Sequence, residues 1–153
     1  LELWLDDLGL SAQHFELELT ERTLVQNIET TLAAMRQLKA QGFYFSIDDF
    51  GTGYSSLSYL KQMPVDIIKI DKSFIQDMEA DSIKSTLIPK IRDIARLLNY
   101  RIVAEGIENL AQASLLRSLG IELGQGWHFA KAMPLAEFAD YLQQFSHQQR
   151  KSS

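Results

Sequence analysis

The sequence predicts an α/β fold, a partial TIM-like (β/α)8 barrel of about five strand–helix units. Five segments are predicted as strands, the first by its alternation of apolar and polar residues, and each is followed by a segment predicted as a helix. Strands that alternate with helices of this length pair in parallel on one sheet. Polar and acidic residues stand at the carboxyl end of every predicted strand, and a barrel brings many such ends to one mouth. An open sheet gathers a site at one switch point instead.

Five strands and their helices follow in order along the chain. The predicted strands are Phe15–Thr20, Phe43–Asp49, Val65–Asp71, Arg101–Ile107 and Ile121–Phe129. The predicted helices run from Thr23 to Gln41, over a short segment ending near Met63, from Ser82 to Asn99, from Leu110 to Leu119, and onward from Pro134. Pro89 predicts a kink or a boundary within the third helix. Trp4 is expected in the core with Phe43, Tyr44 and Phe45.

The chain has 153 residues, whereas a complete barrel takes about 250 and at least about 200. We therefore expect residues 1–147 to form the C-terminal part of such a domain, with the opening strands before Leu1. Residues 148–153 are expected to form a polar, disordered tail. A first strand without a neighbour exposes unpaired backbone groups, which predicts a homodimer or edge-strand association.

Composition excludes several classes of function. The net charge of -5 gives no broad basic field, so direct DNA binding is not expected. The absence of cysteine excludes disulfides, thiolate metal sites and a cysteine nucleophile. No apolar run approaches the roughly 18 residues of a membrane span, and the first residues do not form a signal peptide. We expect a cytoplasmic domain, with any membrane anchor in sequence that precedes it.

The acidic residues predict a metal site. Asp48 and Asp49 are adjacent, so a regular strand would direct them to opposite faces. We therefore expect the strand to end there, which turns both carboxylates toward one site. With Glu18 they supply three hard oxygen ligands, a set that suits Mg²⁺ or Mn²⁺. A solvated acidic strand end is the alternative for the Asp pair alone, and the joint pattern favours the metal site.

Other strand ends fit the same chemistry. Lys69 either pairs with a neighbouring carboxylate or positions a water or phosphate near a metal. Glu105 either caps a helix or acts beside a ligand, in space that Gly106 leaves open. The glycine loop after Asp49, with Gly51 and Gly53, either moves or cradles an anion.

Five motifs in order resemble the EAL-domain phosphodiesterases. They are ELTE from Glu18 to Glu21, DDFGTGYSSL from Asp48 to Leu57, KID from Lys69 to Asp71, AEGIE from Ala104 to Glu108, and QGWHF from Gln125 to Phe129. The resemblance implies hydrolysis of one phosphodiester bond of cyclic di-GMP to linear pGpG at a centre of two Mg²⁺ or Mn²⁺ ions.

The resemblance also implies residue roles. Glu18, Asp48 and Asp49 would bind metal, with Asp48 bridging both ions. Lys69 would hold a water, and Glu105 would act as general base or as a further metal contact. Glu21 would anchor the loop that contains Gly51, Thr52 and Gly53, whereas Gln125, Asp71 and Glu108 would contribute to the substrate pocket.

Two features of that family are absent from this sequence. The Glu-Ala-Leu tripeptide does not occur, nor does the asparagine that precedes ELTE in the family. We therefore expect the chain alone to lack turnover and its parent to hydrolyse cyclic di-GMP, with a sensor or diguanylate cyclase (GGDEF) domain upstream. A cyclic di-GMP receptor without turnover is the main alternative. An enolase-like Mg²⁺ barrel is a third class, and the glycine loop argues against it.

Overall fold

Five parallel strands form one sheet, in the order β1-β2-β3-β4-β5. The computed structural model describes residues 2–21, 23, 28–52, 60–76, 78 and 83–151. The strands are β1 (Glu16–Thr20), β2 (Tyr44–Phe50), β3 (Ile67–Ile70), β4 (Arg101–Ala104) and β5 (Leu123–Gly124). The predicted α/β class with five parallel strands is confirmed.

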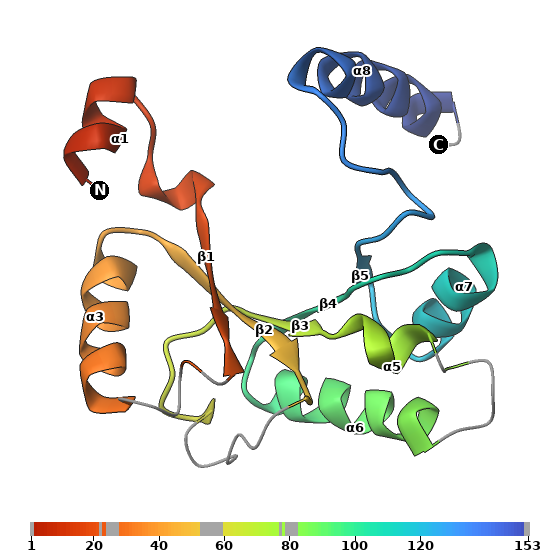
Figure 1. The fold of residues 1–153 in the computed structure, drawn as a ribbon, viewed down its shortest axis with the longest axis horizontal. Helices are drawn as coiled ribbons and strands as arrows, with labels where there is room; N and C mark the ends of the chain where they lie inside the picture. The colour runs from red at the N-terminus through yellow and green to blue at the C-terminus, as the bar shows by residue number, and fades with distance from the viewer. Residues whose placement is uncertain are drawn as a thin grey trace.

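Helices line one side of this sheet. The helical segments are α1 (Glu2–Leu8), the short 3-10 helix η1 (Ala12–His14), α3 (Ile28–Ala40), α5 (Lys72–Gln76), α6 (Ile83–Leu97), α7 (Leu110–Ser118) and α8 (Leu135–Lys151). Figure 1 shows α3, α6 and α7 along one side of the sheet, with α1 and α8 beyond its other side and apart from each other. In this view the helical layer covers one face of the sheet.

The core lies between the sheet and these helices. Phe45 and Ile47 of β2 and Ile68 and Ile70 of β3 are buried against apolar residues of α3, α6 and α7. Because successive side chains of a strand point to opposite faces, Lys69 projects away from that core. The apolar positions therefore fix the strands, and the alternation presents polar side chains on the other face.

The predicted core aromatics are confirmed in part, and the third predicted helix is continuous. Trp4 is 74% exposed, so its predicted place in the core was wrong, and Tyr44 is also exposed. Phe43 and Phe45 are buried as expected. Helix α6 continues through Pro89 rather than ending there.

The C-terminal part also differs. Strand β5 has two residues instead of the nine predicted, because the chain turns at Gly126, where φ is 159° and an added Cβ would lie 2.1 Å from the Ile107 carbonyl oxygen. Helix α8 extends to Lys151, into the segment expected to lack structure, whereas Ser152 and Ser153 lie outside the described residues. None of the helices in the described ranges is both long and apolar enough to cross a membrane.

Candidate metal-binding active site

Lys69 lies at the centre of the site. Its Nζ is 2.7 Å from Glu18 Oε1, 2.7 Å from Glu105 Oε1 and 3.6 Å from Asp48 Oδ1. These carboxylates come from β1, from the residue after β4, and from β2, so the parallel order of the strands brings them together. The lysine side chain is 8% exposed. The structure therefore brings together four predicted site residues around one buried ammonium.

The charge states of this cluster follow from its contacts. Burial alone would lower the pKa of Lys69, but hydrogen bonds to Glu105 and Glu18 outweigh burial and raise that pKa above its ordinary value. The pKa of Glu105 is raised by burial, against the opposing effect of Lys69. Lys69 is thus a permanent cation near neutral pH, while Glu105 holds a proton more readily than an ordinary carboxyl group.

Asp48 and Asp49 reach the same end of the sheet through an irregularity in β2. The predicted strand end was wrong, because β2 continues to Phe50. The pairing with β3 instead shifts between Ile47 and Phe50, and Asp49 adopts φ of 54°, in the left-handed region. This bulge breaks the alternation that would otherwise direct neighbouring side chains to opposite faces.

A second carboxyl pair adjoins the cluster. Asp49 shares a side-chain hydrogen bond with Asp71, and its pKa is raised by burial, by the Asp48 charge and by Asp71. Asp71 has a lowered pKa: burial opposes that shift, but hydrogen bonds from Ser73 and from the Lys72 backbone outweigh it. The Ser73 N–H donates to Asp71 Oδ1 at 2.9 Å, at the start of α5. Asp71 thus ionises more readily than an ordinary carboxyl group, whereas its neighbour Asp49 ionises less readily.

The glycine loop is anchored at its first residue. Glu21 is buried, and its Oε2 accepts a hydrogen bond from the Gly51 N–H at 3.3 Å. The Thr52 hydroxyl donates to the Asp49 carbonyl at 2.8 Å. Gly51 has φ of 98°, and an added Cβ would lie 2.7 Å from the Phe74 ring, so only glycine fits there. Gly53 lies outside the described residues.

The other predicted pocket residues lie in the loops after β4 and β5. Glu108 is exposed; its Oε1 is 3.5 Å from Gln76 Nε2, and its N–H donates to Gln112 Oε1. Gln125 is exposed, and its backbone pairs with Ala104 and Ile107. These contacts leave both residues outside the Lys69 cluster.

The prediction of open space beside Gly106 was wrong. An added Cβ at Gly106 would lie 2.4 Å from the Lys72 Cβ, so the first residue of α5 fills that space. Gly106 therefore allows α5 to approach the loop after β4. Sequence analysis did not anticipate this packing, or the pairing of Asp49 with Asp71, although the Lys-Ile-Asp spacing does place Lys69 and Asp71 on one face.

The donor set fits a divalent cation. In the part of the chain that the structure describes, no three acidic or histidine side chains stand arranged to hold a metal ion. Asp48 Oδ1 is nevertheless buried without a hydrogen-bond partner, since 3.6 Å to Lys69 exceeds hydrogen-bond length. An excess of carboxylate oxygens and one unsatisfied buried oxygen are the features that a hard cation satisfies.

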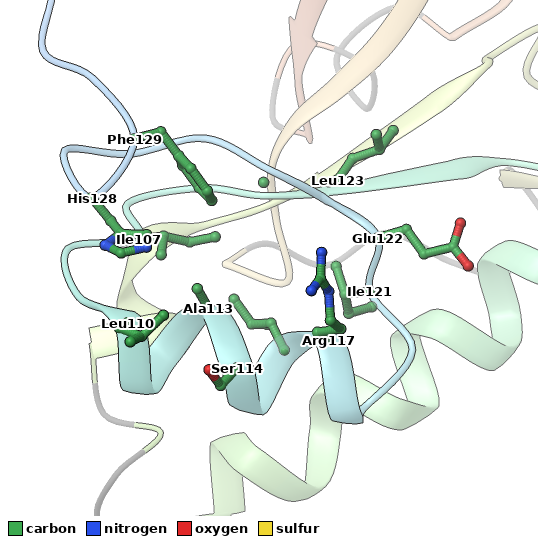
Figure 2. A pocket seen from close by; sticks show the side chains of 12 residues that line it. Ile107, Leu110, Ala113, Ser114, Arg117, Ile121, Glu122, Leu123, His128 and Phe129 are labelled. Carbon is green, nitrogen blue, oxygen red and sulfur yellow. The ribbon is translucent and has the colours of Figure 1, made fainter. Parts of the chain in front are cut away.

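A separate hollow of about 250 Å³ lies between α7 and residues 121–129. Figure 2 shows Leu110 and Ala113 of α7 across from Phe129, with Arg117 and Glu122 at the other end. None of the cluster carboxylates lines this hollow, so it is distinct from the candidate metal site.

Comparison with known proteins identifies the family of this chain. A sequence model of the EAL domain matches residues 1–132. The cyclic di-GMP phosphodiesterase NbdA of Pseudomonas aeruginosa is 41% identical over 141 residues, which cover 92% of this chain and 18% of NbdA. Among solved structures, a PaMucR phosphodiesterase in complex with c-di-GMP has a TM-score of 0.86 at 40% identity, covering 90% of this chain and 56% of that chain.

A second solved structure carries a metal. Klebsiella pneumoniae BlrP1, a manganese and cy-diGMP complex, has a TM-score of 0.78 at 31% identity and covers 85% of this chain and 34% of that chain. The parallel sheet and the acids at its strand ends define a TIM-like α/β domain with an acidic site at one mouth. This chain belongs to the EAL domain family. It spans about half of the matched PaMucR chain and less than a fifth of NbdA.

Proposed function

We propose that this chain supplies the acid- and lysine-bearing side of a phosphodiesterase active site that hydrolyses cyclic di-GMP to linear pGpG with two Mg²⁺ or Mn²⁺ ions. The convergence of Glu18, Asp48 and Glu105 on the buried Lys69 ammonium supports this proposal most strongly. NbdA and PaMucR are named as phosphodiesterases, and BlrP1 is a manganese complex, which also supports the proposal.

The proposed roles follow from the contacts. Glu18, Asp48 and Asp49 hold the ions, which when bound supply a polarised water and a positive field for the phosphate. Lys69 donates hydrogen bonds and orients a water or a phosphate oxygen. Glu105 accepts the proton of the attacking water, a role that its raised pKa supports.

The glycine loop positions this machinery. The Glu21 carboxylate holds the Gly51 N–H, which fixes the loop immediately after Asp49. Gln125, Glu108 and Asp71 stand at neighbouring strand ends, where we assign them to the substrate pocket. The test of these assignments is whether their substitution raises KM for cyclic di-GMP more than it lowers kcat.

We also propose the localisation, the oligomeric state and the further domains of the whole protein. We assign it to a cytoplasmic, homodimeric protein that also carries a sensor or diguanylate cyclase domain. The name of the P. aeruginosa relative MucR, a bifunctional diguanylate cyclase and cyclic di-GMP phosphodiesterase, supports the second domain. Sizing chromatography with intact mass tests the dimer, and a monodisperse monomer contradicts it.

The direct test of the function joins this chain to the preceding part of the PaMucR phosphodiesterase domain. We expect pGpG formation from cyclic di-GMP with Mn²⁺, and a loss of about 1,000-fold in rate for Asp48→Asn. Lys39→Met, which removes a lysine far from the site residues, is the matched control and retains the rate. Tight binding of cyclic di-GMP without pGpG contradicts the enzyme and favours a receptor.

A further inference from the structure

We propose that Lys69 is an internal cation that holds the strand-end carboxylates together when no divalent ion is bound, and that it competes with that ion for them. This inference rests on the proposed metal site. It assigns Lys69 a positioning role in the metal-free protein, in addition to its contact with water or phosphate in the loaded one.

The holding role follows from the positions of the partners. Lys69 Nζ contacts Glu18 of β1 and Glu105, the residue after β4, at 2.7 Å each, and β1 and β4 are not neighbours in the sheet. Carboxylates gathered at one point repel each other unless a cation lies among them. The lysine side chain is 8% exposed, so solvent has little access to take its place. Within the described chain, Lys69 is the cation paired with all three carboxylates of the cluster.

The competing role follows from distance. Carboxylate oxygens bind Mg²⁺ at about 2.0–2.1 Å, whereas the two glutamate oxygens here each stand 2.7 Å from an ammonium nitrogen. An ion bound to either glutamate oxygen would lie no more than about 5 Å from Nζ, and two positive charges at that distance repel. Metal binding therefore weakens the hold of Lys69 on these glutamates, and Lys69 in turn weakens metal binding.

Lys39 offers a matched contrast. It pairs with one carboxylate, Asp66, which also accepts the Phe45 N–H at 2.9 Å. The pair lies at the amino ends of the strands and includes no predicted metal ligand. Removal of Lys39 therefore deletes a lysine–carboxylate bond without changing the charge at the strand-end cluster.

The test compares Lys69→Met with Lys39→Met in the full chain. Thermal unfolding in chelator and Mn²⁺ titration by calorimetry are the two readouts. For Lys69→Met we expect the metal-free Tm to fall by about 5 °C, and the Mn²⁺ Kd to become at least about tenfold tighter. Lys39→Met is expected to lower Tm and leave the Mn²⁺ Kd unchanged. A Lys69→Met variant with unchanged or weaker Mn²⁺ binding overturns the proposal.

Lys69→Arg keeps the test decisive where Lys69→Met does not fold without metal. Arginine retains the charge, so we expect a metal-free Tm within about 3 °C of the unsubstituted chain and Mn²⁺ binding no tighter than that chain shows. Tenfold tighter binding by Lys69→Arg would overturn the competition. Neither readout involves cyclic di-GMP, so failure to form pGpG counts against the proposed function alone.

Discussion

At the amino ends of the strands Lys39 faces a single carboxylate, whereas at the carboxyl ends Lys69 faces three. Asp66 uses both of its oxygens, one for Lys39 and one for the Phe45 N–H. Asp48, in contrast, has a buried oxygen without a hydrogen-bond partner. The Lys39–Asp66 pair is therefore balanced: it has one charge of each sign, and both carboxylate oxygens have partners. The Lys69 cluster is unbalanced, because it has more carboxylates than cations and one oxygen without a hydrogen-bond partner.

The difference distinguishes a structural ion pair from a site. A balanced pair holds α3 against the strands β2 and β3 and needs no further ligand. A cluster with more carboxylates than cations is stable only while something offsets their repulsion. The carboxyl ends of the strands are therefore where a divalent ion adds most to this molecule.

Of the three substitutions compared below, the largest effect on stability is expected at the balanced Lys39–Asp66 pair. Asp66→Ala removes the partner of Lys39 and of the Phe45 N–H and should cost about 2 kcal/mol in unfolding free energy. Urea denaturation measures this loss, and Mn²⁺ binding should not change. Asp93→Ala is the control, since Asp93 is 56% exposed in its pair with Arg92 and should cost less than about 0.5 kcal/mol. Equal losses in the two variants would contradict the distinction.

A smaller change in unfolding free energy, of opposite sign, is expected in the unbalanced Lys69 cluster. Asp48→Asn removes one of the repelling carboxylates, so the metal-free chain should gain about 0.5 kcal/mol. The same urea experiment in chelator measures it. A loss as large as that of Asp66→Ala would show that Asp48 serves the fold in the way that Asp66 does.

The smallest effect concerns pH. The folded chain raises the pKa of Asp49, through burial and then the Asp48 and Asp71 charges, so it binds that proton more tightly than the unfolded chain does. Stability of the metal-free chain should therefore fall as pH rises from about 4, the ordinary carboxyl value, through the raised pKa. Asp49→Asn should make this fall shallower in thermal unfolding between pH 4 and pH 7. An unchanged profile would contradict the raised pKa of Asp49.

Much of the fold was predictable because it depends on local pattern. Apolar, aromatic and β-branched residues along Phe43–Asp49 and Val65–Asp71 mark two strands, and most of those residues lie in the core. The nine-residue strand predicted from Ile121 was wrong because the turn at Gly126 depends on its contact with Ile107, which is distant in sequence.

The site was predictable in residue type but not in arrangement. The sequence indicated Glu18 as a metal ligand together with Asp48 and Asp49, and it left a structural alternative open for Lys69 and for Glu105. That one ammonium joins them depends on strand order and register, which no local pattern contains. The bulge at Asp49 likewise depends on the pairing of β2 with β3.

We conclude that the carboxylates around Lys69, at the carboxyl ends of the strands, bind a divalent cation. Calorimetric titration of the chain with Mn²⁺ tests this conclusion most directly. We predict saturable binding to the unsubstituted chain, about 100-fold weaker binding to Asp48→Asn, and unchanged binding to Asp66→Asn. Equal Mn²⁺ affinity in Asp48→Asn and the unsubstituted chain would contradict the account.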